Sequence, residues 1–561
     1  MTTRPEIGSF ADQQFDLIVI GAGINGAGIA RDAAMRGLRV LLLDKGDIGG
    51  GTTSWSTRLI HGGLRYLEHA EIGLVRESLR ERERLLRIAP HLVKPLPLMI
   101  PIYRGDRRGP WLIRFGMVAY DLLSYDKSLD RHRMLSREEA LHRLPALNPT
   151  GLAGAAVYYD AQVEYAERLA VENALAARTA GATLLTYAAV ERLLIENGAV
   201  AGVVVRDRRQ DRATASTVRA PIVINVAGPW VDDILDDDQI APQSRLIGGT
   251  KGSHLVVGAF AGAPRDALYV EARRDGRPFF IVPWNDQYLI GTTDSRYSGD
   301  PDDAVAETAE IDYLIAETNR VLPEAGLTRD DVHYAYAGVR PLPYRANGKE
   351  GAISRRHHVL VHADNGGPKG LFSVVGGKLT TYRELSEQAV DAIYRARGES
   401  APPCRTAQVP LPGGAFADGE SVETLLGGLA TESGLSQQSA AHLGRVYGAR
   451  AVAVIALARV PGRAELIAPF DADSGAIGAE VVYAFEEEAA VTLADCLLRR
   501  TMVGLGPRVG IGADEAAAAI AARHLGWDAR RIRDEVAAYR AAVQRLRPPT
   551  VVLAEASVLG A

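Results

Sequence analysis

Cysteines and long apolar runs are scarce in this chain, which excludes several classes of protein. Its 561 residues include two cysteines, Cys404 and Cys496, too few for a disulfide framework or a metal site with four thiolates. We therefore expect a reducing compartment. No stretch reaches the roughly 18 consecutive apolar residues of a membrane span. Residues 1–14 lack the apolar core of a signal peptide, so we do not expect secretion.

Lysine is also rare, and the chain has no excess of positive charge. Its 64 basic residues, 7 lysines and 57 arginines, face 69 acidic ones, which gives a formal net charge of −5. Nucleic-acid-binding domains are usually strongly basic, so no nucleic-acid partner is expected. With 47% hydrophobic and 24% charged residues, the composition is globular, and the length suits about two to four domains.

A glycine motif near the N-terminus predicts a dinucleotide site. Residues 15–20 form an apolar run typical of a buried strand, and residues 27–35 are typical of a small-residue helix. Between them, Gly21 permits a tight turn, Gly23 lets the backbone approach a pyrophosphate, and Gly26 lets helix and strand pack closely. The helix N-terminus would then supply free N–H groups to the phosphates.

The residues after this motif favour FAD over a nicotinamide cofactor. A second apolar strand, residues 38–43, ends in Asp44, an acid placed to bond ribose hydroxyls, which disfavours NADP. The chain then enters residues 49–66, where glycines and hydroxyl groups are mixed with His61, Arg65 and Tyr66. This stretch has the groups to enclose a second phosphate and the flavin edge, and to present polar side chains to a substrate.

Motif order carries a family resemblance. From GAGINGAG through STRLIHGGLRY to KGSH, PW, IGTTD, GVRP and GGKLTTYR, the chain resembles the FAD-dependent glycerol-3-phosphate dehydrogenases, close relatives of the glycerol-3-phosphate oxidases. The resemblance covers about residues 15–384, and residues 483–501 are similar to that family's C-terminal helical domain. The combination of LIHGGLRY with GVRP and GGKLTTYR is far more specific than the dinucleotide motif.

The resemblance implies an α/β fold of the D-amino-acid oxidase kind. We expect a Rossmann-like FAD-binding domain interleaved with an antiparallel-sheet substrate domain, followed by an α-helical C-terminal domain. The expected limits are 15–75, 155–240 and 335–390 for the FAD-binding domain; 76–154 and 241–334 for the substrate domain; and 391–547 for the helical domain. A break at Pro548 and Pro549 precedes the expected tail, residues 548–561.

The residues expected to contact FAD belong to the dinucleotide turn, the stretch after Asp44, the turn after a strand at 220–226, and a second glycine turn at 376–381. That second turn also joins a strand, residues 371–375, to a helix N-terminus, which repeats the arrangement of an anion site. The expected FAD contacts are Gly21, Gly23, Ile24, Asn25, Gly26, Asp44, Lys45, Thr52, Thr53, Ser54, Ser56, Leu59, Ile60, Ala227, Gly228, Gly377, Lys378, Leu379 and Thr380.

Oxidation of a secondary alcohol by a flavin needs a base for the hydroxyl proton. His61 is the first candidate and His254 the second, because a neutral imidazole accepts a proton near pH 7. For either histidine, a structural hydrogen bond is the competing interpretation. Lys378 is expected to bind the phosphate, or to stabilise the developing alkoxide or the reduced flavin; the sequence leaves this choice open.

A doubly charged substrate phosphate needs several fixed cations, and arginine suits it because its planar group binds oxygens in pairs. Arg65, Arg340 and Arg355 are the candidates. By motif, the family places Arg65 with Tyr66, Arg340 and Lys378 in the substrate site. The implied reaction is oxidation of sn-glycerol 3-phosphate to dihydroxyacetone phosphate, with electrons passed to a membrane quinone.

Residues 111–125 are bulky and apolar and follow Arg104, Arg107 and Arg108, a pattern that suits a helix lying in a membrane surface. Burial in the substrate domain explains the same pattern. The family implies peripheral membrane association, so we expect a cytoplasmic protein on the inner face of the cell membrane. Residues 76–87, with mixed charges at helical spacing, predict a solvated helix face.

Several alternatives stay open. One is a glycerol-3-phosphate oxidase that uses oxygen, and another is a related flavin-dependent amine or amino-acid oxidase. A flavoprotein acting as a structural or nucleic-acid partner is disfavoured by the net charge of −5. No metal site is expected, since no D-x-D-x-D-G calcium loop occurs. The oligomeric state is not settled by the sequence, and a homodimer is one hypothesis.

Overall fold

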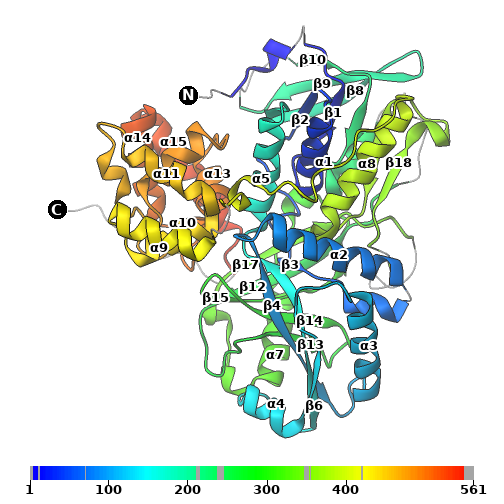
Figure 1. The fold of residues 1–561 in the computed structure, drawn as a ribbon, viewed down its shortest axis with the longest axis vertical. Helices are drawn as coiled ribbons and strands as arrows, with labels where there is room; N and C mark the ends of the chain where they lie inside the picture. The colour runs from blue at the N-terminus through cyan, green and yellow to red at the C-terminus, as the bar shows by residue number, and fades with distance from the viewer. Residues whose placement is uncertain are drawn as a thin grey trace.

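The computed structural model describes residues 4–10, 13–69, 71–209, 215–236, 240, 245–346, 353, 355–417 and 421–548, and all counts refer to these residues. Figure 1 shows three bodies: a domain built on a parallel sheet, a second built on an antiparallel sheet, and a helical domain formed by the C-terminal part of the chain. The predicted tail after residue 548 lies outside the described residues.

The parallel-sheet domain is built on six strands. Short apolar segments flanked by glycines form its centre, and five strands run parallel while β18 pairs antiparallel at one edge. The strand order is β18 (His358–Val361), β19 (Leu371–Val375), β11 (Val223–Asn225), β1 (Leu17–Ile20), β2 (Val40–Leu43) and β7 (Thr183–Leu185). The carboxyl ends of β1, β11 and β19 therefore meet at one edge, where a ligand is expected in such sheets.

Two different layers cover the faces of this sheet. One face packs against α1 (Ile24–Met35), α5 (Ala166–Thr179) and α8 (Tyr382–Ala396). The other face packs against a three-stranded antiparallel sheet of β8 (Ala188–Glu196), β9 (Ala199–Asp207) and β10 (Ser216–Arg219). Burial on both faces explains why the central strands are continuously apolar.

The antiparallel-sheet domain contains ten strands, which alternate in direction except for the parallel pair β13 and β4. They are β3 (Leu59–Ile60), β4 (Val93–Tyr103), β5 (Arg133–Ser136), β6 (Leu152–Val163), β12 (Thr250–Val257), β13 (Ala267–Glu271), β14 (Pro278–Trp284), β15 (Gln287–Gly291), β16 (Ser295–Arg296) and β17 (Val332–Arg340). One face packs against α4 (Arg137–Arg143) and α7 (Thr308–Val321), whose Ile311, Leu314 and Ile315 are buried.

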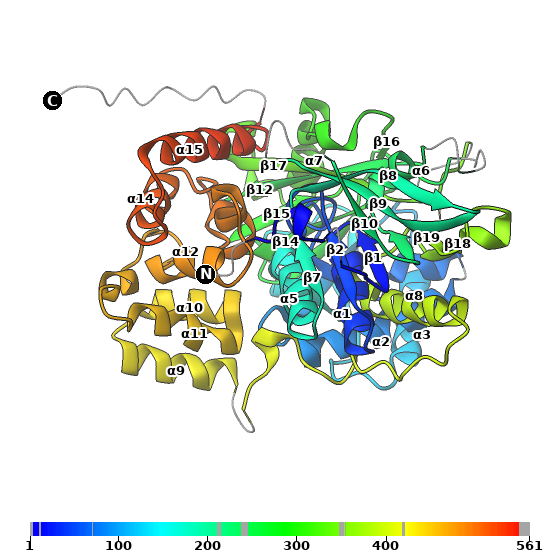
Figure 2. The same ribbon diagram turned by 90° about the horizontal axis from the view of Figure 1, so that it is seen from above.

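The other face of this sheet packs against α2 (Ile72–Ile88) and α3 (Pro110–Leu123). The C-terminal end of α2 also packs into the core of the parallel-sheet domain, where α6 (Val231–Leu235) follows β11. The helical domain contains α9 (Val422–Ser433), α10 (Gln437–Tyr447), α11 (Ala451–Ala458), α12 (Gly478–Glu486), α13 (Leu493–Asp495), α14 (Ala513–Leu525) and α15 (Ala529–Gln544). Seen from above in Figure 2, this domain lies beside α5 and the strands β14 and β15.

The predicted α/β architecture with a helical C-terminal domain is confirmed. Three expected domain limits nevertheless fall inside elements: 75/76 inside α2, 154/155 inside β6, and 334/335 inside β17. The short strand β3 also pairs with β6 in the antiparallel sheet. The backbone pairing of β6 and β17 continues past the expected limits, and the sequence shows no change in composition there that would mark a boundary.

The prediction of a solvated face over residues 76–87 is wrong for part of α2. Glu81 and Arg82 are fully buried, where Glu81 accepts hydrogen bonds from Arg383 and Arg82 donates to Asp160 at 2.6 Å. Charge alternation at helical spacing looks the same on a solvated face and on a face that pairs with other elements. Here the helix pairs with α8 of the parallel-sheet domain through Glu81 and with β6 of the antiparallel sheet through Arg82.

Candidate active site

The predicted dinucleotide turn lies between β1 and α1. Gly21 has φ of +103°, and a Cβ there would come within 2.6 Å of the Val226 carbonyl oxygen. A Cβ on Gly26 would come within 1.8 Å of the Gly21 carbonyl oxygen. Both positions therefore require glycine, for the turn and for the contact between helix and strand that the sequence predicted.

Donor groups and an acid line this turn. The N-cap residue of α1, Gly23, has no side-chain cap, and Asn25 Oδ1 is buried without a hydrogen-bond partner. The Asp44 carboxylate at the end of β2 accepts from the backbone N–H groups of Ala22 at 2.6 Å and Gly46 at 2.8 Å. The N-terminus of α1, the glycine backbone and the fixed carboxylate fit the diphosphate and ribose of a dinucleotide.

The residues after Asp44 fold back over the start of α1. Thr53 Oγ1 accepts from the Ile24 N–H at 3.1 Å, and Ser54 donates to the Gly49 carbonyl at 2.7 Å. Lys45 lies apart from this group, because its ammonium pairs with Asp302 at 2.6 Å and lies 4.0 Å from the centroid of the Trp230 ring. Lys45 thus faces the antiparallel-sheet domain.

The two later glycine turns converge on the same sheet edge. Ala227 and Gly228 follow β11, and Gly376 and Gly377 follow β19. A Cβ on Gly377 would come within 2.8 Å of Asn25 Nδ2, so the second turn lies directly against the first turn of α1. The parallel order of β1, β11 and β19 explains this, since all three strands end on the same side of the sheet.

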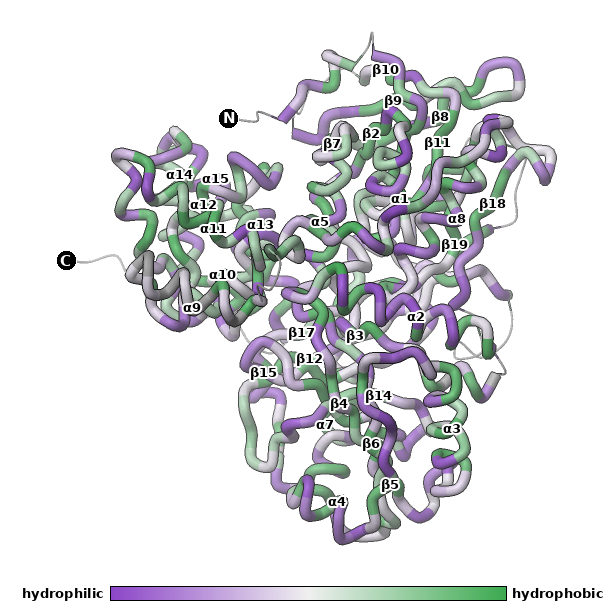
Figure 3. The backbone as a smooth tube through the Cα atoms, viewed as in Figure 1, coloured by the Kyte–Doolittle hydropathy of each residue, from purple (hydrophilic) through white to green (hydrophobic). Residues whose placement is uncertain are grey.

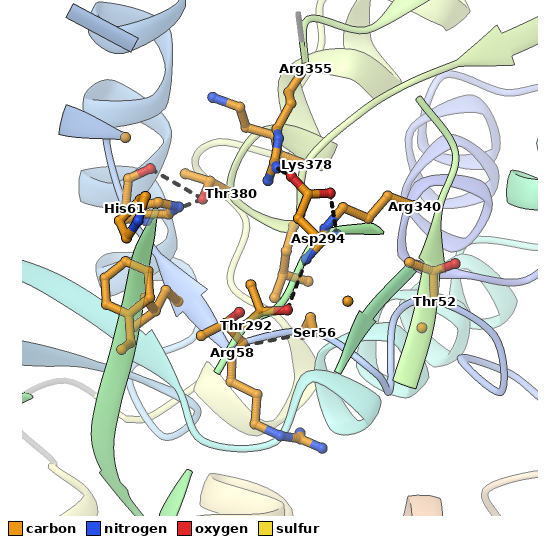
Figure 4. A pocket seen from close by; sticks show the side chains of 18 of the residues that line it. Thr52, Ser56, Arg58, His61, Thr292, Asp294, Arg340, Arg355, Lys378 and Thr380 are labelled. Atoms are coloured by element: carbon orange, nitrogen blue, oxygen red, sulfur yellow. Dashed lines mark hydrogen bonds and ion pairs between the residues drawn. The ribbon is translucent and has the colours of Figure 1, made fainter. Parts of the chain in front are cut away.

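A cavity of about 210 Å³ lies between the two sheets and contains most of the predicted substrate residues (Figure 4). Of the predicted residues, those that line it are Thr52, Ser56, Leu59, His61, Tyr66, His254, Arg340, Arg355, Gly377, Lys378, Leu379 and Thr380. The residues of the dinucleotide turn, with Asp44, Thr53, Ser54, Ile60, Ala227 and Gly228, lie outside its lining. The cavity is therefore the substrate end of a longer site.

Three guanidinium groups in the cavity surround one buried carboxylate. Arg340 donates to Asp294 Oδ1 at 3.0 Å, Arg277 donates to Oδ2, and Arg355 lies 3.8 Å from Oδ2. Burial opposes ionisation of Asp294, yet the three arginines lower its pKa to about 2. Figure 4 shows Asp294 between Arg340 and Arg355. With one carboxylate among three guanidinium groups, the cluster keeps a positive charge suited to an anion.

Backbone geometry at the KGSH motif makes room for this cluster. A Cβ on Gly252 would come within 2.0 Å of the Arg340 guanidinium, so any side chain at this position of β12 would displace Arg340. Arg340 also donates to Thr292 Oγ1 at 2.9 Å and to the Thr293 carbonyl at 3.1 Å. Arg340 is held by these acceptors before any substrate binds.

His61 is half-buried, and in Figure 4 it lies on the opposite side of Lys378 from Arg340. Its backbone N–H donates to Thr380 Oγ1 at 3.2 Å, which ties the LIHGG loop to the second glycine turn. Its ring lies edge-on to Phe280 with centroids 6.3 Å apart. His61 thus lines the cavity beside the second glycine turn.

His254 is fully buried on β12. Its Nε2 lies 2.8 Å from Thr57 Oγ1, its ring stacks on Tyr336 at 4.9 Å, and its Nδ1 has no partner. Burial, with Arg340 and Arg58 nearby, lowers its pKa well below the usual value. His254 is therefore a neutral imidazole and a weak base.

Lys378 lies deep in the cavity. Its ammonium is 3.8 Å from the centroid of the Tyr66 ring and donates to Ser78 Oγ at 3.4 Å. Burial lowers its pKa, while Tyr66 and Glu77 act in the opposite direction. Burial and Glu384 raise the pKa of Glu77 to about 7. A cation with few acceptors beside the glycine turn is available to a substrate oxygen or to the cofactor.

The sequence missed two members of the anion cluster, Arg277 and Asp294. Asp294 closes the IGTTD motif, so the motif itself was a usable signal, whereas Arg277 precedes β14 in a loop without a recognisable pattern. Arg65 lies in the short 3₁₀ helix Leu64–His69, and its side chain lies outside the described part of the structure. Among the described residues, no group of three metal-ligating side chains is found.

Two family models match the chain. The model of FAD dependent oxidoreductases matches residues 16–383, and the model of the C-terminal domain of alpha-glycerophosphate oxidase matches residues 404–532. Together they cover the two sheet domains and most of the helical domain.

Individual relatives agree with these models. The chain is 48% identical over 549 residues to a glycerol-3-phosphate dehydrogenase of Synechocystis sp., covering 96% of this chain and 97% of the relative. It is 40% identical to a D-erythritol 1-phosphate dehydrogenase of Brucella abortus, covering 87% and 94%. A solved glycerol-3-phosphate dehydrogenase from Bacillus halodurans complexed with FAD superposes with a TM-score of 0.79 at 28% identity, covering 98% of each chain.

Proposed function

Because the chain belongs to the FAD-dependent glycerol-3-phosphate dehydrogenase family, we propose that it oxidises sn-glycerol 3-phosphate to dihydroxyacetone phosphate and passes the electrons to a membrane quinone. FAD is the cofactor of the family, and the glycine turns and Asp44 fit it. The observation that carries the substrate proposal is the arginine cluster beside His61 and Lys378, in a cavity lined by the second glycine turn.

In this proposal the arginine cluster binds the phosphate. Arg340, Arg355 and Arg277 present guanidinium groups that Asp294 already orients, so little ordering cost falls on substrate binding. A phosphate dianion matches several fixed cations, whereas the single carboxylate of an amino acid would leave positive charge unpaired. This favours a phosphorylated polyol over the amine and amino-acid oxidase alternative.

FAD, when bound, supplies the hydride acceptor. His61 accepts the proton of the secondary hydroxyl, and Lys378 stabilises the negative charge that develops on the same oxygen. Phe280, Tyr158 and Tyr269 form an apolar wall that excludes water from the reacting carbon. The two ends of the substrate are thus held by the arginine cluster and by the His61 side of the cavity.

Anaerobic addition of sn-glycerol 3-phosphate to the purified holoprotein tests the substrate assignment. The flavin absorbance near 450 nm should bleach at a rate that saturates with substrate, and glycerol without phosphate should leave it unchanged. A flavin that stays oxidised would overturn the assignment.

A longer polyol phosphate is the second candidate substrate, because one relative at 40% identity is a D-erythritol 1-phosphate dehydrogenase. The more similar relative, at 48%, acts on the three-carbon substrate by name. Bleaching rates with both phosphates in the same experiment decide between them, and a higher kcat/KM for erythritol 1-phosphate would move the assignment to the four-carbon substrate.

The exposed face of α3 supports the membrane part of the proposal. Trp111, Leu112, Phe115 and Leu122 are 54–80% exposed, and Tyr125 beyond the helix is 78% exposed. Figure 3 shows this hydrophobic segment at the edge of the molecule. Arg104 and Arg107 lie exposed just before the helix, as suits a helix in an anionic membrane surface. No helix among the described residues is long and apolar enough to cross a membrane.

This face lies one layer from the cavity. Tyr120, on the buried side of α3, accepts from the Gly62 N–H at 2.9 Å, and Gly62 follows His61. A lipid-soluble acceptor that reaches α3 would therefore be close to the His61 side of the cavity, on a membrane at the inner face of the cell. Comparing peroxide yield with turnover on a soluble quinone tests this acceptor; stoichiometric peroxide would favour the oxidase alternative instead.

A further inference from the structure

Two consecutive arginines of the helical domain converge on one carboxylate of the cofactor turn, which we define as residues 44–51. Asp47 accepts from Arg500 through both oxygens, at 2.8 and 2.9 Å, and from Arg499 Nε at 2.5 Å. Asp47 and Arg500 are fully buried, and the side chain of Arg499 is 12% exposed. Burial opposes ionisation of Asp47, but the two guanidinium groups outweigh it and lower its pKa.

A local departure from α-helical geometry permits this convergence. Residues Cys496–Arg500 form a π-helix directly after α13, and the Thr501 N–H bonds to the carbonyl of Cys496, five residues earlier. Consecutive side chains on an α-helix point about 100° apart, and a wider helical turn reduces that angle. Arg499 and Arg500 can therefore reach the same carboxylate. Such π-helical segments occur frequently at functional sites.

A second connection joins the same two segments. The Tyr187 N–H donates to the Gly46 carbonyl at 2.9 Å, and the Tyr187 hydroxyl donates to Asp495 Oδ1 at 2.6 Å. Asp495 also accepts from Arg499 at 2.8 Å. The turn that carries Asp44 is thus bound to α13 and the π-helix by a closed set of hydrogen bonds.

The next residues of the helical domain bind the antiparallel sheet. The Leu505 carbonyl accepts from Asn285 at 3.1 Å, from Gln287 at 3.0 Å and from the Tyr334 hydroxyl at 2.8 Å. One short segment, residues 496–505, therefore contacts both the cofactor turn and the hairpin of β14 and β15. Figure 2 shows the helical domain alongside both sheet domains.

We infer that this segment of the helical domain is a brace for the cofactor site, in which Arg499 and Arg500 are positioning residues that hold the cofactor turn in its FAD-binding geometry. The turn carries Asp44, the residue assigned to the ribose, and Asp47 is its only acidic side chain besides Asp44. Without the two arginines, the buried Asp47 would lose its partners and the turn would have to rearrange. The inference rests on the assignment of Asp44 to FAD.

The test measures the dissociation constant of FAD from apoprotein by flavin fluorescence. Arg500→Gln should raise it roughly 10- to 100-fold, by analogy with the range that outer partners show at metal sites. Arg500→Lys should restore part of the loss. At saturating FAD, kcat and KM for the substrate should stay within about twofold of the parent values.

Matched variants separate this effect from general destabilisation. Arg508→Gln removes an exposed ion pair with Asp473 in the same domain and should leave FAD affinity unchanged. If Arg500→Gln does not fold, Arg499→Gln keeps the Arg500 pair and should weaken FAD binding by a smaller factor. An unchanged FAD dissociation constant in these variants, with apo and holo melting temperatures falling equally, would overturn the inference.

A further variant, Asp44→Asn, distinguishes failure of the brace from failure of the Asp44 assignment. Asp44→Asn should weaken FAD binding if the cofactor turn holds the ribose. If Asp44→Asn has no effect while glycerol 3-phosphate still bleaches the flavin, the proposed function stands and the brace is refuted together with the assignment of the turn. If Asp44→Asn weakens binding and Arg500→Gln does not, only the brace is refuted.

Discussion

Asp294 shows how one buried acid can prepare a site for an anion. Its carboxylate accepts from Arg340 and Arg277, and its pKa, lowered to about 2, keeps it ionised near neutral pH. The negative charge of Asp294 therefore offsets the repulsion between the guanidinium groups, and its hydrogen bonds fix their orientation. A substrate phosphate then binds groups that are already fixed, which lowers the entropy cost of binding.

Arg340→Gln should raise KM for glycerol 3-phosphate roughly 10- to 100-fold and change kcat little, because charge-assisted hydrogen bonds to the phosphate contribute about 1.5–3 kcal/mol. Steady-state kinetics with a soluble dye measures this. Arg329→Gln, which removes an exposed pair with Asp312 in the same domain, is the control. A lower kcat with unchanged KM would place Arg340 at the reacting carbon instead.

His61→Gln should slow flavin reduction in stopped-flow experiments by about 10²–10⁴-fold, the usual contribution of a general base. FAD content and substrate affinity should change little, because only the imidazole is lost. His254→Gln should have the smaller effect, since burial already lowers the pKa of His254 well below its usual value. The opposite order of the two effects would make His254 the base.

Loss of the Glu77 carboxylate should shift the alkaline limb of the pH–activity profile, because Glu77 acts on the pKa of Lys378. Ionised Glu77 raises the pKa of Lys378, so Glu77→Gln should let that pKa fall further. Lys378 loses its proton as the pH rises through its pKa. The alkaline limb of kcat/KM should therefore move to lower pH, by roughly half a unit to one unit. The exposed Glu324→Gln is the control, and an unmoved limb would contradict the coupling.

At the scale of elements, α2 and α3 show where sequence patterns are ambiguous. Mixed charges on α2 suggested a solvated face, but the helix lies between two sheets and Glu81 and Arg82 are buried in ion pairs. The apolar pattern of α3 left burial and membrane contact open. Ile113 and Met117 face the core, while Trp111 and Phe115 face outward. The three-dimensional neighbours of a helix, absent from its own sequence, decide such cases.

Trp111→Ser combined with Phe115→Ser should weaken sedimentation with anionic phospholipid vesicles by more than tenfold, because each side chain contributes about 1.5–3 kcal/mol when fully buried. Turnover with a soluble dye should stay unchanged, since α3 binds the site only through its buried side. Val452→Ser on α11 removes a 50% exposed apolar side chain elsewhere and serves as the control. Equal vesicle binding by all variants would refute α3 as the membrane surface.

At the scale of the whole molecule, buried ion pairs join the helical domain to the parallel-sheet domain. Glu488 pairs with Arg168 at 2.6 Å, Glu172 with Arg450 at 3.0 Å, and Asp47 with Arg500. Burial opposes ionisation of Glu488, but Arg168 and Arg450 lower its pKa to about 2. The pKa of Glu172 and that of Asp47 are lowered as well.

These lowered pKa values predict acid release of the cofactor. The stability that such carboxylates contribute is fully present above their ordinary pKa of 4.5 for glutamate, and it is lost as the pH falls toward about 2. Flavin fluorescence should therefore rise within this window, before the far-ultraviolet circular dichroism of the sheets is lost. Release that begins above about pH 5 would point to other groups.

Local patterns in the chain specify much of this protein. The glycine turn with its flanking strand and helix, the acid after β2, the α/β class and the helical C-terminal domain all depend on residues close together in sequence, where sterics and periodicity act directly. Even the family could be named from motifs such as LIHGGLRY and GGKLTTYR, and the matches to known proteins confirm it.

The arrangement of the site depends on contacts between distant residues, and these appear only in the folded molecule. Asp294 and Arg277 join Arg340 because β14, β15, β12 and β17 are successive neighbours in one sheet. Asp47 meets Arg500 across 453 positions of sequence. Ion pairing and burial depend on which residues meet in the folded chain, so the net charge of −5, which follows from composition alone, could not reveal them. The sequence by itself showed that cysteines are few and that no long apolar span occurs. The exposure of one face of α3 was decided only by how the helix packs on its neighbours.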